Sequence, residues 1–205
     1  MAILNHTLGI FLHPDSEWES IRQEQSSFQS VFFGHIPFLA LIPCVSAYIG
    51  VTKVGWTIGD GAPVLLAAES ALAFCALAYV GLLIGVYLFG EFINWMARTY
   101  GVQDDKQRRH DESGAMAVYV STPMFLAGIF NIYPQLWLIV ASLCVAGAYT
   151  VYLIYEGMPI LMKIDKERAF MYSSSVITVG LVLMVSTMIA TVLVWSMGTG
   201  PVFID

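Results

Sequence analysis

The sequence predicts an all-α integral membrane protein, a bundle of five transmembrane helices preceded by a short amphipathic helix. Hydrophobic residues make up 58% of the 205 residues. Only 12% are charged, against about 25% in soluble domains. Five stretches approach the roughly 20 apolar residues that cross a bilayer core of about 30 Å. Because a soluble fold of this composition would expose large apolar patches, the chain is expected to lie in lipid.

The five crossings are expected within a single membrane domain of residues 30–199. Their predicted ranges are 31–51, 64–97, 115–132, 136–155 and 170–197. Only Tyr133, Pro134 and Gln135 separate the third stretch from the fourth, which predicts a tight helical hairpin. Residues 200–205 are left as a short tail.

Residues 1–29 precede the first crossing and are expected to hold one short amphipathic helix. Ser16 and Glu19 have the spacing of a capping box, in which a hydroxyl and a carboxylate cap the first backbone N–H groups. Trp18 and Ile21 then fall on one face. Such a helix is expected to lie at the membrane surface or against the bundle.

The distribution of lysine and arginine predicts the orientation. With five crossings, eight of the nine basic residues fall on one side, and only Lys53 falls on the other. These eight are Arg22, Arg98, Lys106, Arg108, Arg109, Lys163, Lys166 and Arg168. Basic loops stay in the cytoplasm, so the N-terminus is predicted to be cytoplasmic and Asp205 to lie outside.

Six of these basic residues form a candidate face for a protein partner or anionic lipid, worth about 1 kcal/mol per cation near a membrane surface. They are Arg98, Arg108, Arg109, Lys163, Lys166 and Arg168.

A turn is predicted just before Lys163, Lys166 and Arg168. Its residues are Tyr155 at headgroup depth, Glu156, Gly157 in a left-handed conformation and Pro159 as a helix stop.

Two features inside the crossings point to helix geometry. Pro123 is expected to kink the third helix, with neighbouring hydroxyls bonding the freed backbone groups. Gly81 and Gly85 form a GxxxG pattern in the second helix. Such small residues let helices approach closely. That approach is predicted either within the bundle or between subunits, so an oligomer is one of the two readings.

Catalytic and cofactor chemistry find no support in the sequence. The three cysteines form no CxxC pair, and neither a GxSxG nor an HExxH motif occurs. Glu69 and Glu91 are about 33 Å apart along one helix, so both can lie at the membrane surfaces. The four histidines are expected to be hydrogen-bonded or solvated. We therefore predict no enzyme, no metal, no cofactor and no nucleic-acid partner.

The order of several short motifs resembles the Yip family of membrane proteins, in its proteobacterial inner-membrane branch. The motifs are GIFLHPD at 9–15, IGVTKVGW at 49–56, GDG at 59–61, WMAR at 95–98, YVSTP at 119–123, YP at 133–134 and YEGMP at 155–159. The resemblance implies a multi-pass protein of the bacterial inner membrane, with a cytoplasmic N-terminus and a periplasmic C-terminus.

Two functions remain open from the sequence. The resemblance and the lack of deep charges favour a non-enzymatic scaffold or adaptor that binds proteins or lipids. The alternative is a small transporter or channel, because Pro37, Pro43 and Pro123 could break helices around a binding site. Eukaryotic Yip proteins are associated with Rab GTPases. Their signature at the first helix is absent here, where residues 33–37 read FGHIP, so that role is not carried over.

Overall fold

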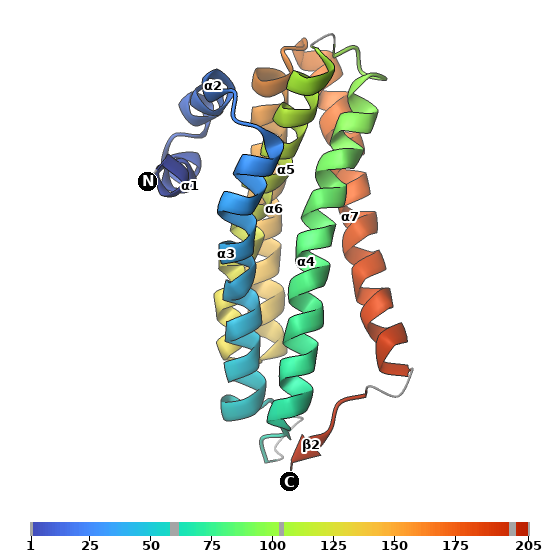
Figure 1. Ribbon diagram of the computed structural model, residues 1–205. Helices are drawn as coiled ribbons and strands as arrows, with labels where there is room; N and C mark the ends of the chain where they lie inside the picture. The colour runs from blue at the N-terminus through green and yellow to red at the C-terminus, as the bar shows by residue number, and fades with distance from the viewer. Residues whose placement is uncertain (1, 58–61, 103–104, 197–199, 205) are drawn as a thin grey trace.

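The computed structural model describes residues 2–57, 62–102, 105–196 and 200–204. This part of the chain contains two short helices followed by five long ones (Figure 1). Their bounds are α1 Ala2–Leu12, α2 Pro14–Glu24, α3 Phe28–Ile49, α4 Ala68–Ala97, α5 Lys106–Ala127, α6 Leu136–Met162 and α7 Lys166–Ser196. Helices α3 to α7 are each long and apolar enough to cross a membrane. The predicted fold class is therefore confirmed.

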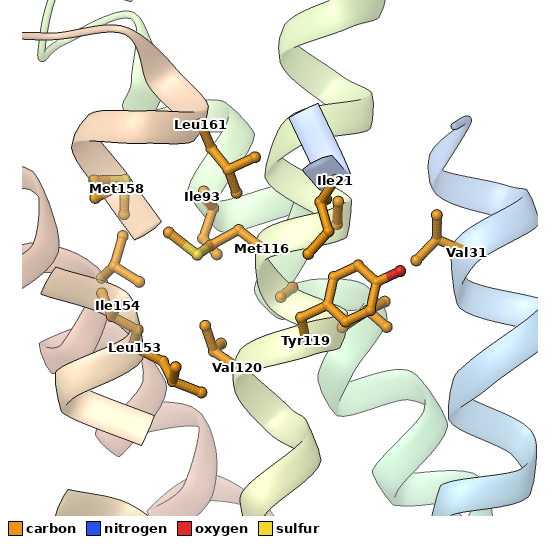
Figure 2. Close-up of a cluster of buried hydrophobic side chains, with 14 of the residues drawn as sticks. Ile21, Val31, Ile93, Met116, Tyr119, Val120, Leu153, Ile154, Met158 and Leu161 are labelled. Atoms are coloured by element: carbon orange, nitrogen blue, oxygen red, sulfur yellow. The ribbon is translucent and has the colours of Figure 1, made fainter. Parts of the chain in front are cut away.

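Helix α5 runs through the middle of the bundle. It packs against α3, α4 and α6, while α7 packs against α4 and α6 from the outside (Figure 1). Two irregular helical segments lengthen the spans: a π-helical segment at Gly50–Val54 follows α3, and a 3-10 helix at Gly128–Ile132 follows α5. Figure 2 shows the centre of the core, where side chains of α4, α5 and α6 meet around Met116.

The N-terminal segment forms two helices where one was predicted. Helix α2 begins at Pro14 rather than Ser16, because proline is preorganised for the first helical position. The Ser16 hydroxyl donates to the carbonyl of His13 and does not cap the helix. Helix α2 packs along α6 and buries Trp18 and Ile21, so the predicted apolar face lies against the bundle.

Helix α5 begins at Lys106 rather than at residue 115. The Asp105 carboxylate accepts a hydrogen bond from the Gln107 amide and caps the start. The first turns carry charged residues, but their side chains find partners: Arg109, for example, donates to the Asn94 amide oxygen of α4 at 3.3 Å. A polar segment that reads as a loop is thus helical because neighbouring helices cover it.

The turn predicted at Tyr155, Glu156, Gly157 and Pro159 is wrong, because α6 continues through all four to Met162. Lys163 ends the helix in the left-handed conformation, with φ of 46°. Packing by α2 overrides the local stop signals in two ways. The indole of Trp18 lies on Gly157, where a Cβ atom would be 2.5 Å from the ring. The Arg22 guanidinium donates to the Ile160 carbonyl, which the helix end leaves without an intrahelical donor.

A small antiparallel sheet closes the opposite end of the molecule. Strand β1, Leu65–Leu66, pairs with strand β2, Phe203–Ile204, near the C-terminus (Figure 1). The predicted tail is therefore attached to the segment that leads into α4. The motif at 59–61 lies outside the described residues.

Candidate functional site

Charged side chains gather at one end of the bundle, formed by α2, the α4–α5 connection and the α6–α7 turn. We call this the polar end (Figure 1, top). A buried ion-pair group ties α2 to α5 there. Arg22 Nη2 lies 3.6 Å and Arg108 Nε 3.0 Å from the same oxygen of Glu112. The side chains of Arg22 and Glu112 are each only 8% exposed. Because moving α2 away would leave the Glu112 carboxylate without one of its two cations in a buried position, this group favours the observed packing of α2 on α5.

A cavity of about 240 Å³ lies beside this ion-pair group. Its lining carries both signs of charge, with Arg22 and Arg108 near Asp105, Asp111 and Glu112. Most of these side chains bond other parts of the same chain. The Asp111 carboxylate accepts hydrogen bonds from the backbone amide that begins α3 and from a glutamine side chain of α5. Such a cavity can take a small polar group, but its lining does not select an anion.

The structure divides the six predicted face residues into two sets. Arg109 is buried and donates to Asn94, so the expectation that it contacts an outside partner is wrong. The reason is that α5 starts early and turns this side chain toward α4. Arg108 is 36% exposed and engaged by Glu112. The other four are exposed, and we call them the basic quartet: Arg98, Lys163, Lys166 and Arg168.

Arg168 lies where the α4–α5 connection approaches the start of α7. Its guanidinium pairs with Asp165 at 3.3 Å and lies over Gly101, where a Cβ atom would be 2.7 Å from Nη1. Exposed aromatic side chains lie next to the quartet along the helices. Trp95 precedes Arg98 by three residues, and Phe170 follows Lys166 by four, so each shares a helix face with a cation. Aromatic rings beside basic side chains are typical of headgroup depth.

A histidine cluster that the sequence did not reveal joins α1 to α2. The two ring nitrogens of His6 are hydrogen-bonded to Glu17 and, at 2.8 Å, to Glu24. Burial lowers the pKa of His6, but the hydrogen bonds and charges of both carboxylates outweigh burial and raise this pKa above its ordinary value. The available signal was the spacing of the two acids, seven residues apart on one face of a helix.

A second histidine lies beneath this cluster. His35 of α3 is 3% exposed. Its Nε2 is 3.3 Å from the Thr7 hydroxyl of α1 and 3.4 Å from the Thr122 hydroxyl of α5. The ring of Tyr119 lies 5.4 Å away in an edge-to-face arrangement. His35 is therefore a hydrogen-bonded residue at the place where α1, α3 and α5 meet.

The remaining predicted residues serve helix geometry. Pro123 lies inside α5, and the hydroxyls of Ser121 and Thr122 bond carbonyls one turn earlier. The kink itself stays a prediction. A Cβ atom at Gly81 or Gly85 would meet nothing within 4 Å. Close packing of these glycines within the bundle is therefore wrong, and only packing between subunits stays a prediction.

Comparisons with known proteins agree with this architecture. The Yip1 domain matches residues 8–187, from α1 into α7. Inner membrane protein YohC of Escherichia coli K12 is 36% identical over 197 residues, which cover 95% of this chain and 98% of that protein. YohC of E. coli O6:H1 strain CFT073 matches to the same extent. No solved structure matches. With the match spanning nearly the whole chain and all five apolar helices in place, the protein belongs to the Yip1 family of multi-pass inner membrane proteins.

Proposed function

We propose that this protein is a non-enzymatic membrane adaptor that holds a partner protein at its polar end. In this proposal the basic quartet contacts anionic lipid headgroups and fixes the height of that end at the membrane surface. The observation that carries the proposal is an uneven distribution. Apolar side chains fill the axis of the bundle, whereas exposed cations, an ion-pair group and a polar cavity lie together at one end.

The packed centre of the bundle favours a protein that binds a partner over one that conducts a solute. Met116, Val118 and Val120 of α5 are fully buried. Figure 2 shows Met116 and Val120 among side chains of the neighbouring helices, Leu153 and Ile154 of α6 included. A solute path along this axis would have to displace packed apolar side chains.

The transport alternative loses the observation that motivated it. Pro37 and Pro43 lie inside α3, and Pro123 lies inside α5. Both helices continue through their prolines instead of breaking into half-helices. Broken helices, whose ends can bind a substrate, are the feature that transporter sites are typically built from. The adaptor is therefore the better supported of the two functions.

Neutralising three of the four cations of the quartet tests the lipid contact. We would replace Arg98, Lys163 and Lys166 by glutamine and leave Arg168, since it pairs with Asp165. Retention of phosphatidylglycerol and cardiolipin, measured by native mass spectrometry, should fall by up to about a hundredfold, because each of the three cations contributes about 1 kcal/mol near the membrane surface. Lys53→Gln is the matched control, an exposed lysine at the other end. Equal losses in both variants would contradict a specific face.

Partner binding needs a separate measurement. In-cell photo-crosslinking from exposed positions of α2 should give a discrete protein adduct, and the triple glutamine variant should weaken it. A pattern of lipid-only adducts from every position would contradict the adaptor function while leaving the lipid contact intact.

The orientation can be tested with reporter fusions. A periplasmic reporter after Asp205 should be active, and a cytoplasmic reporter inserted at Gln103, between α4 and α5, should be active as well. The physical reason is the retention of basic loops in the cytoplasm. Activity of a cytoplasmic reporter at Asp205 would show the reverse orientation and would place the basic quartet on the wrong side.

A further inference from the structure

The contacts of α1 differ from those of α2. Helix α2 is anchored in the bundle by Trp18, which is fully buried against Gly157, and by Arg22, which bonds both Glu112 and the end of α6. Helix α1 contacts α2 more extensively than it contacts α3 or α5. Helix α1 also touches α6, where the Tyr149 hydroxyl donates to the Ile10 carbonyl at 3.0 Å and the Tyr149 ring stacks on Phe11. Within the described part of the chain, its attachment to α2 is the one that involves charged side chains.

His6 is the polar centre of that attachment. Both of its ring nitrogens face carboxylate oxygens of α2, one from Glu17 and one from Glu24. A neutral imidazole has one N–H donor, and only the protonated ring has two. Since an ionised carboxylate only accepts, the observed arrangement satisfies both contacts when His6 carries a proton. Deprotonation leaves one carboxylate facing a lone pair at close range.

Among the described residues, two further titratable groups lie near His6. From α5, the ring of Tyr119 faces it edge-on at 6.0 Å. From α3, His35 contacts Thr7, which is the residue that follows His6 in α1. Arg22 of α2 is directed to the other side, toward Glu112 and Ile160. Glu17 and Glu24 are thus the charged groups that decide the protonation of His6.

We propose that α1 is a lid that opens and closes by turning about His13, while α2 stays in place. When His6 is protonated, α1 stays closed over His35 and Tyr119. When His6 loses its proton, α1 opens. His13 joins the two helices in a non-helical conformation, which suits a hinge. The close approach supports a latch, because a Cβ atom at Gly9 would overlap the Glu17 carboxylate. This inference does not depend on the adaptor function.

The direction of the pH effect follows from the two carboxylates. The pKa of His6 lies above its ordinary value of 6.5 in the closed state. A histidine whose pKa is raised in one state stabilises that state at low pH. This stabilisation disappears as the pH rises through the raised pKa. The lid should therefore be closed in acid and open in alkali.

Distances between spin labels can test the lid in the full chain in nanodiscs. Cys44, Cys75 and Cys144 would be replaced by alanine. One label pair joins Ala2, at the end of α1 farthest from His13, to the exposed position Phe33 of α3. A second pair joins Glu19 of α2 to Phe33. Between about pH 5 and about pH 8.5, where histidine titrates, the α1 pair should change from a narrow to a broad distance distribution. The α2 pair should stay narrow.

Variants assign the change to His6. His6→Gln should abolish the pH dependence and leave the α1 distribution broad throughout. Glu24→Gln, at a half-exposed position, should shift the midpoint to lower pH without a folding defect. Two matched controls should behave like the wild type: His110→Gln, which removes a histidine bonded to Glu91 at 2.9 Å, and Glu19→Gln, an exposed acid of α2.

Three outcomes would overturn the proposal. The first is an α1 distribution that does not change with pH in the wild type. The second is a pH response that survives in His6→Gln or is unmoved in Glu24→Gln. The third is a parallel change of the α1 and α2 pairs, which would mean that the whole N-terminal segment moves as one unit.

Discussion

Helices α5 and α7 reverse the relation between hydrophobicity and burial that holds in soluble proteins. The most apolar part of α7 is more hydrophobic than that of α5, yet only 6% of its residues are buried inside the bundle. The corresponding part of α5 is the least hydrophobic of the five spans, and 56% of its residues are buried. In a bilayer the outside is the apolar solvent, and helices associate through close packing and hydrogen bonds. Hydropathy thus follows lipid contact here, and the interior combines apolar side chains with small and polar residues.

The sharpest test of this contrast is the same truncation in both helices. Met116 of α5 is fully buried, and Met188 of α7 is 60% exposed. Met116→Ala should lower the free energy of unfolding by about 2–5 kcal/mol, because it leaves a cavity in a packed core. Met188→Ala should change it by less than about 0.5 kcal/mol. Reversible unfolding in mixed micelles measures both, and equal losses would break the contrast.

A second test compares two glycines of α6. Gly157 lies under Trp18, whereas a Cβ atom at Gly147 would meet nothing within 4 Å. Gly157→Val should destabilise the protein by about 1–3 kcal/mol through overpacking against the indole. The cause is a clash between helices and not a left-handed backbone, since Gly157 is helical. Gly147→Val should be nearly neutral. The same unfolding assay, applied to both variants, distinguishes the two sites.

The smallest expected effect concerns Gly81 and Gly85 of α4. Both have open space beside them in the single chain. Changing each to alanine should leave the monomer unchanged or stabilise it by up to about 1 kcal/mol per site, because alanine favours helix over glycine. Crosslinking in the membrane reports on a second copy. A dimer that disappears in this double variant would show that these glycines face another subunit.

The five crossings could be predicted because a run of apolar residues is a local property of the sequence. Their ends could not. Arg109 and Glu112 read as loop residues, but α5 buries them because Asn94 and Arg22 come from elsewhere to bond them. The polar stretch before residue 115 is helical for that reason. Gly157 and Pro159 signal a stop that packing by α2 overrides.

The candidate site was predicted in part. Alternation of the crossings brings Arg98, Lys163 and Lys166 to one end, and the structure shows them exposed there. The contacts of His6 were missed because α1 has no helical periodicity that would place His6 on a particular face. Its partners, Glu17 and Glu24, are chosen by how α1 folds back onto α2. The spacing of the two acids places them on one face of α2, but the pairing with His6 depends on tertiary structure.

The pairing of β1 with β2 has a consequence for the mechanics of α7. Residues 184–193 of this helix are exposed, so little of the bundle supports them. The strand at Phe203–Ile204 fastens the chain beyond α7 to Leu65–Leu66, just before α4. Because this pairing joins the two ends of a long chain segment, it limits the positions that the end of α7 can take relative to the start of α4.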